Sequence, residues 1–130
     1  MLVSLVVARA SKRTLVVFVQ RNKKFGSRIR RRYVVFEVAT VAEIQESDLR
    51  AAIENKFKDI FGLEGLTLSG LRLIMYDPKL RRGIIRVRSN YFDQLMATLG
   101  FVRSINNYRV FLYPLATSGT VRRALKKLRS

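Results

Sequence analysis

The chain has neither cysteine nor histidine among its 130 residues. The absence of cysteine excludes disulfides and thiolate nucleophiles, and the absence of both residues excludes the usual zinc sites and imidazole acid–base catalysis. The 9 acidic residues are dispersed without metal-ligand spacing, and no phosphate-binding glycine loop occurs. We therefore expect no autonomous active site, no metal site and no cofactor bound by the protein itself.

Long apolar runs are also missing. In the first quarter of the chain the longest apolar runs cover only residues 5–8 and 15–19. A membrane-spanning helix needs about 20 apolar residues. We expect no transmembrane helix and no membrane partner. Because a chain without cysteine fits a reducing compartment, we expect a cytoplasmic protein.

Basic residues, by contrast, are abundant. The 26 lysines and arginines give a net charge of +17, and the isoelectric point is about 11.4. Such a charge indicates a protein that binds polyanions, with nucleic acid as the favoured partner. An anionic membrane surface is the alternative. It is less favoured because the charge is spread over a folded pattern instead of one amphipathic helix.

The charge is uneven along the chain, since residues 1–32 hold 10 basic residues and no acidic one. We therefore predict a basic N-terminal extension, residues 1–31, followed by one domain, residues 32–130. In the extension, MLVSLVVA and TLVVFVQ flank RASKR and predict a hairpin or an added edge strand. The segment 21–32 reads as a basic linker or a disordered arm. A targeting peptide is disfavoured by the strand-like VVFVQ.

From residue 32 the apolar pattern becomes regular. Alternation predicts strands over residues 32–40, 71–77, 83–88 and 108–115. Spacings of three and four predict a helix from Ser47 or Asp48 to Gly62, and another between Asn90 and Gly100. The order strand, helix, strand, strand, helix, strand is the βαββαβ arrangement of ferredoxin-like and RRM-like α+β folds. Both helices should cover one face of a four-stranded antiparallel sheet and leave the other face open.

A basic C-terminal helix follows this framework. Ser118 is the predicted cap, and Val121, Ala124 or Leu125, and Leu128 form an apolar stripe. Five cations lie around that stripe: Arg122, Arg123, Lys126, Lys127 and Arg129. This helix and the N-terminal extension are available to cover part of the open face or an edge of the sheet.

The stretch RGIIRVRS invites comparison with the signature of RNA-recognition domains, which stack bases on aromatic side chains. Arg82 and Gly83 match its opening, but Ile84 and Arg86 stand where the aromatic residues belong. Base stacking on this strand is therefore not expected. Arg86 and Arg88 instead share one face, where two guanidinium groups suit phosphate oxygens. The alternatives are a solvated sheet face or pairing with Glu37 across the sheet.

The segment SGTVRRALKK also suits phosphate, because a helix N-terminus with small residues presents free N–H groups and the following cations neutralise further charge. An ordinary capped surface helix is the alternative. Asp77 before Pro78 indicates a turn and not a catalytic carboxylate. The predicted RNA-binding residues are Arg30, Arg31, Arg32, Arg86, Arg88, Ser118, Gly119, Thr120, Arg122, Arg123, Lys126 and Lys127. Tyr33, Arg72, Tyr76 and Arg82 are candidates for contact with either RNA or a partner protein.

Several motifs, in order and in register, carry a family resemblance. They are RRRYVVFEV, IFG at 60–62, LRLIMYD, GIIRVRSN and ATSGTVRRALKKL, and the likeness spans about residues 30–129. The most specific feature is GIIRVR followed about 30 residues later by SGT and a basic helix. In these motifs the chain resembles the archaeal and eukaryotic Pop-five protein subunits of ribonuclease P. The basic extension at 1–29 is longer than that family leads us to expect.

The resemblance implies a noncatalytic protein subunit of a ribonucleoprotein that removes 5′ leaders from precursor tRNA, with Mg²⁺ held by the catalytic RNA. It also implies three partners: the ribonuclease P RNA, a TIM-barrel-like ribonuclease P protein, and precursor tRNA indirectly. Self-association as a dimer of heterodimers is implied as well. Arg32, Tyr33, residues 83–88 and residues 118–120 match the recurrent motifs of the family.

Other functions stay open at this point. The first alternative is a ribosomal or other ferredoxin-fold RNA-binding or chaperone protein. A protein adaptor whose charge is incidental is the second, and an autonomous nuclease is the third. The sequence also leaves open whether the open sheet face meets RNA or the protein partner.

Overall fold

A computed structural model describes residues 30–130 of the chain. The hairpin or edge strand predicted for MLVSLVVA and TLVVFVQ lies outside the described residues. The elements follow in the order β2 (Arg31–Ala39), α2 (Glu46–Ser69), β3 (Arg72–Asp77), β4 (Arg82–Arg88), the 3-10 turn η1 (Ser89–Tyr91), α3 (Phe92–Phe101), β5 (Ser104–Ile105), β6 (Tyr108–Arg109), β7 (Phe111–Ser118) and α4 (Val121–Arg129).

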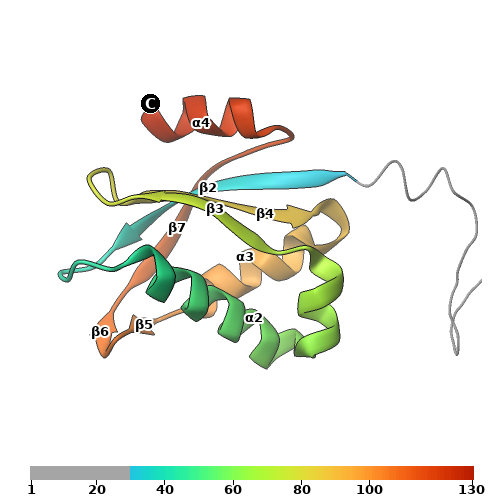
Figure 1. Ribbon diagram of the computed structural model, residues 1–130, viewed down its shortest axis with the longest axis horizontal. Coiled ribbons are helices and arrows are strands. Elements are labelled where there is room, and N and C mark those ends of the chain that lie inside the picture. The colour runs from blue at the N-terminus through green and yellow to red at the C-terminus, as the bar shows by residue number, and fades with distance from the viewer. Residues whose placement is uncertain (1–29) are drawn as a thin grey trace, which may run out of the picture.

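The four long strands form one antiparallel sheet in the order β3-β4-β2-β7. Its two central strands, β4 and β2, are therefore not consecutive in sequence, as the split βαβ arrangement requires. Figure 1 shows three layers, with α2 and α3 on one side of the sheet and α4 on the other. The predicted α+β ferredoxin-like fold with an added C-terminal helix is confirmed.

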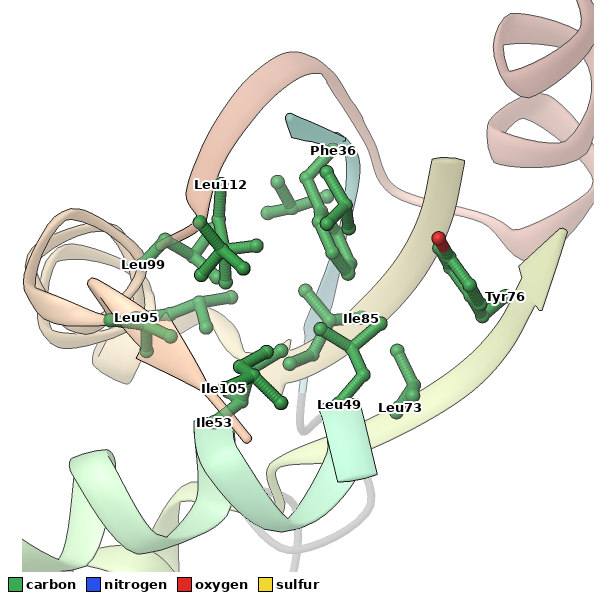
Figure 2. Packing of buried hydrophobic residues seen from close by; sticks show 14 of the residues in the cluster. Phe36, Leu49, Ile53, Leu73, Tyr76, Ile85, Leu95, Leu99, Ile105 and Leu112 are labelled. Atoms are coloured by element: carbon green, nitrogen blue, oxygen red, sulfur yellow. The ribbon is translucent and has the colours of Figure 1, made fainter. Parts of the chain in front are cut away.

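The main core lies between the sheet and the two helices, on what we call the helix face. Alternation along β2 sends Val34, Phe36 and Val38 into it, and along β4 it sends Ile85 and Val87. Figure 2 shows these strands meeting side chains from α2, α3 and β7, among them Leu49, Ile53, Leu95, Leu99 and Leu112. The inward and outward assignment of both strands is as predicted.

Glycine at position 83 permits the packing of Phe36. A Cβ built on Gly83 would lie 2.9 Å from Phe36 Cζ and 3.0 Å from the Met75 carbonyl oxygen. The phenylalanine ring therefore crosses the strand at the point where the neighbouring residue has no side chain. The Arg-Gly pair that resembled a base-reading signature thus has a packing reason for its glycine.

The structure differs from the sequence prediction at several element ends. Gly62 does interrupt the first helix, with φ 83° and ψ 167°, but helical structure resumes and runs to Ser69. The second helix begins at Phe92, because residues from Ser89 onward first form a 3-10 turn. The predicted strand 108–115 is divided at Val110, since β6 pairs with β5 while β7 joins the main sheet.

Candidate nucleic-acid interface

Helix α4 covers the middle of the sheet surface opposite the helix face, which we call the α4 face. Its Ala124 and Leu128 are buried against Val35 of β2 and Ile84 of β4 in a second, smaller core. This burial holds the apolar stripe of α4 down and leaves its basic side in solvent. The prediction that the C-terminal helix covers part of the open face is therefore confirmed.

The start of α4 is fixed by side-chain hydrogen bonds. Thr120 is the N-cap, and its Oγ1 accepts a hydrogen bond of 3.2 Å from the Arg123 amide. The Ser118 hydroxyl donates to the Thr120 carbonyl oxygen at 2.7 Å. The prediction of Ser118 as the cap was wrong by two residues: its hydroxyl positions the turn, and the threonine caps the helix.

The cations of α4 point away from the core. Arg122, Arg123, Lys126 and Arg129 are exposed. Lys127 is also exposed, and its Nζ donates to the Thr117 carbonyl oxygen at 2.7 Å, which draws it toward the end of β7. No acidic residue occurs in α4, so nothing within the helix offsets this charge.

Beside the N-terminal end of α4, one row of the sheet carries two more arginines. The strand register places Arg72, Arg86, Tyr33 and Ser118 across β3, β4, β2 and β7 in that order. Arg86 is half-buried, and its Nε is shielded from solvent with no hydrogen-bond acceptor among the described residues. An arginine held in this way keeps its charge on the α4 face without an internal partner.

The next row adds Arg31 and Arg88, which are register partners on β2 and β4. The stem of Arg88 lies over Gly70, where an added Cβ would sit 3.4 Å from both its Cγ and its Nε. A surface hollow of about 400 Å³ opens at this edge, lined by Arg30, Arg31, Arg32, Tyr33 and Gly119. Residues from the start of β2 and from the loop before α4 therefore meet here, although they are far apart in sequence.

Two of the predicted site residues, Arg32 and Arg82, also make contacts within the domain. Arg32 lies on the helix face, with its guanidinium 5.3 Å from the centre of the Phe92 ring. Arg82 pairs with Glu37 at 3.3 Å and donates to the Leu128 carbonyl oxygen at 3.0 Å, so it ties the end of α4 to the sheet. The suggested alternative that Glu37 pairs with Arg86 or Arg88 is therefore wrong.

Tyr76 is removed from the α4 face altogether. It is only 7% exposed and belongs to the main core. Burial raises the pKa of its phenol above the usual value, and the positive charge of Arg81 partly offsets that rise. Its proposed contact with RNA or a partner stays a prediction, as do the contacts of the other candidate residues.

Acidic residues gather on the opposite side of the molecule. Five lie in α2, namely Glu46, Asp48, Glu54, Asp59 and Glu64, and Asp93 lies in α3. Near the α4 face, Glu37 is neutralised by Arg82. Asp77 accepts hydrogen bonds from the amides of Lys79 and Leu80 at 2.9 and 3.3 Å, which confirms its role in a turn. The described domain is therefore polarised, with an unneutralised cationic surface around α4.

The sequence prediction missed a group at the other end of the sheet. An exposed aromatic pair, Phe111 and Tyr113, lies on the edge strand β7, and Phe111 lines a surface hollow together with Arg103 and Arg109. The alternation of 111 and 113 with the buried Leu112 could have revealed it, because residues two apart on a strand share a face. Within residues 30–130 no three acidic side chains gather as metal ligands, and no helix there is long and apolar enough to cross a membrane.

Comparison with known proteins gives a consistent result. Residues 32–129 match the Rpp14/Pop5 family. The chain is 37% identical to ribonuclease P protein component 2 of Aeropyrum pernix, over 81% of this chain and 87% of that protein. It is 31% identical to the protein of the same name from Saccharolobus solfataricus, over 94% of this chain and 84% of that protein.

A solved structure agrees at the level of the fold. One chain in a cryo-EM structure of yeast ribonuclease MRP matches with a TM-score of 0.59 and 16% identity, over 77% of this chain and 88% of that one. The fold, the order of the motifs and the similarity over most of the sequence lead to one conclusion. The chain is a member of the Rpp14/Pop5 family.

Proposed function

We propose that this protein is a noncatalytic, RNA-binding subunit of ribonuclease P that supports the catalytic RNA in removing 5′ leaders from precursor tRNA. Its relatives named ribonuclease P protein component 2 support the assignment to that assembly. The observation that carries the RNA-binding role is the polarised charge of the domain. Arg122, Arg123 and Lys126 stand exposed on a helix without acids, above the sheet arginines of the α4 face.

Such a surface would act through phosphate neutralisation. Folding of a catalytic RNA brings phosphates together, and cations that replace condensed counterions reduce the repulsion between them. Arginine suits this task because its planar fork meets phosphate oxygens through two parallel hydrogen bonds. We expect the protein to lower the Mg²⁺ concentration that the RNA requires, while the metal ions of the reaction stay on the RNA.

The outer surface of α2 and α3 has the opposite character and suits a protein partner. Leu63 is 67% exposed just after the Gly62 break, and Ile60, Leu68 and Phe101 are also exposed. Apolar side chains among the carboxylates of α2 are a poor match for RNA and a good match for a protein surface. We assign this face to the TIM-barrel-like protein and to self-association of the heterodimer, and we expect the assembly to act in the cytoplasm.

Reconstitution tests the proposal. The ribonuclease P RNA, with its other protein subunits, is assayed on precursor tRNA with and without this chain over a series of Mg²⁺ concentrations. We expect cleavage to begin at lower Mg²⁺ with the chain present. The variant Arg122→Gln with Arg123→Gln should lose much of that gain, whereas Lys56→Gln with Lys58→Gln, which removes the same charge from α2, should keep it.

The outcomes separate the proposal from its alternatives. Equal losses in the two double variants would show that only net charge matters and would refute the assignment to the α4 face. Cleavage by the protein without RNA would indicate an autonomous nuclease. An equal effect on the folding of unrelated RNAs would favour a general RNA chaperone.

A further inference from the structure

Strand β7 carries an exposed pair of aromatic rings at the edge of the sheet. Phe111 and Tyr113 are 50% and 51% exposed, and their ring centres lie 6.1 Å apart with an angle of 26° between the planes. Leu112 between them is buried in the main core. The two rings are therefore held by a fixed strand, stack on one another, and leave their outer faces to solvent.

The surroundings of Phe111 are polar and cationic. A surface hollow of about 480 Å³ is lined by Arg103, Ser104, Asn107, Arg109 and Phe111, which lies within the range of about 300 to 1,000 Å³ common for small-ligand sites. No carboxylate lines it. An aromatic ring that shares a hollow with two arginines has the chemistry that recognises a flat base attached to a phosphate.

Hydrogen bonds fix this hollow in place. The Val110 amide donates to the Arg103 carbonyl oxygen at 2.9 Å, and the Thr40 hydroxyl donates to the Arg109 carbonyl oxygen at 3.0 Å. The β5–β6 hairpin is anchored to α2, because the Asn106 amide group donates to Asp48 at 2.9 Å. The Asp48 carboxylate is therefore already hydrogen-bonded at the tip of the hairpin. The backbone of both arginines that line the hollow is therefore held by hydrogen bonds.

We propose that Phe111 and Tyr113, with Arg103 and Arg109, form a binding site for unpaired RNA nucleotides, distinct from the phosphate-neutralising surface around α4. Bases of a single strand stack on the free ring faces while the arginines contact the adjoining phosphates. A duplex gains nothing from these rings, because its bases already stack within the helix. This inference rests on the proposed function, and it gives the RNA-binding subunit a preference for single strands at one edge of its sheet.

A protein strand adding to β7 is the competing occupant, since a free sheet edge invites pairing. Pro114 opposes it, because proline cannot donate a hydrogen bond from its backbone nitrogen. The register of β7 against β2 also shifts next to Pro114, opposite Val35 and Phe36, and such an irregularity twists an edge away from a new strand. The one acidic residue opposite Tyr113 is Glu37, already paired with Arg82. The proline and the register shift at this edge disfavour a protein strand, and the pairing of Glu37 with Arg82 leaves no free carboxylate opposite Tyr113 in the described domain to repel RNA.

Binding of fluorescent RNA to the full chain tests the proposal. Three probes of equal length are compared by anisotropy at fixed salt: a single strand, an abasic single strand and a duplex. The variant Phe111→Leu with Tyr113→Leu should bind the single strand about 5-fold or more weakly. Base stacking contributes about 1 to 3 kcal/mol per base, and 1.4 kcal/mol corresponds to a tenfold change in affinity. The affinity for the abasic strand and for the duplex should change less than about 2-fold. Phe101→Leu, an equally exposed aromatic residue on α3, is the matched control.

A second variant reports on the site directly. The chain has no tryptophan, so Phe111→Trp introduces a single indole whose fluorescence a stacked base should quench, while the abasic strand should not. If the double leucine variant lost affinity equally for all three probes, or kept its affinity for the single strand, the inference would be overturned. Loss of self-association without change in RNA affinity would show a protein contact instead. If the unmodified chain bound none of the probes, the proposed function itself would fail, which is a different result from a lost preference.

Discussion

Arg86 offers a test in which stability and RNA binding should move in opposite directions. Its Nε is buried and has no acceptor among residues 30–130. Replacing it in Arg86→Met keeps an unbranched stem of similar length over the sheet and removes both the unsatisfied donor and the charge. A buried donor without a partner costs about 1 to 3 kcal/mol.

We expect the low end of that range, because the remainder of the Arg86 side chain is only partly buried. Arg72 is the register neighbour of Arg86 on β3. Removing one of these two like charges should therefore add to the stability that Arg86→Met gains. A stabilisation of about 1 kcal/mol raises the melting temperature of a domain of this size by roughly 4 to 8 °C. The same substitution should flatten the dependence of log K on log salt by about 0.9 for duplex RNA or 0.7 for a single strand.

Thermal unfolding followed by circular dichroism, together with RNA titrations from low to moderate salt, measures both effects. Arg88→Met is the matched control, because its stem lies over Gly70 and none of its nitrogens is buried without a partner in the described structure. That variant should change the salt slope to a similar extent with stability within about 0.5 kcal/mol of the original. Destabilisation by Arg86→Met would contradict a cost from the buried Nε, and an unchanged salt slope would contradict a phosphate contact at Arg86.

Two further predictions concern the core. Gly83→Ala places a methyl group against the Phe36 ring and the Met75 carbonyl oxygen; overpacking of this kind should destabilise the domain by about 1 to 3 kcal/mol in a denaturant titration, and a neutral result would contradict the packing described. Because burial raises the pKa of Tyr76 in the folded state, the unfolded chain loses this proton first as pH rises. Stability should therefore be unaffected by the group below about pH 10 and fall above it. Tyr76→Phe should show a shallower decline in unfolding free energy between pH 9 and 11, and parallel curves would count against a raised pKa.

Strands β2, β3 and β4 were predictable from their alternating pattern, whereas the predicted strand 108–115 proved to be divided between β6 and β7. Ile85 and Val87 enter the main core while Arg86 and Arg88 stay outside it, as periodicity alone required. The cap of α4 was harder, because Ser118 and Thr120 are both good capping residues and only the backbone of the turn decides between them. Local sequence gives no measure of that backbone.

The candidate site was predictable in its charge and not in its contacts. Arg82 was a candidate for contact with RNA or a partner protein, yet its side chain pairs with Glu37 and donates a hydrogen bond to the end of α4. The difference depends on which residues stand opposite in the sheet and on where α4 docks, and both are long-range facts. Likewise, alternation puts Phe111 and Tyr113 on one side of a strand, but their exposure depends on the place of β7 at the edge of the sheet, which is a long-range fact.

The position of α4 in the chain links the exposed basic surface to the completion of folding. Val35 and Ile84, which α4 buries, come from strands that must first be brought together with β7 before the helix has a surface on which to dock. Contacts between segments so far apart in sequence form late, because the entropy of closing long loops opposes them. A partly folded chain would therefore expose an apolar patch where the finished domain presents its cations. The basic surface is thus a property of the fully assembled domain, because α4 can dock only after β2, β4 and β7 have paired.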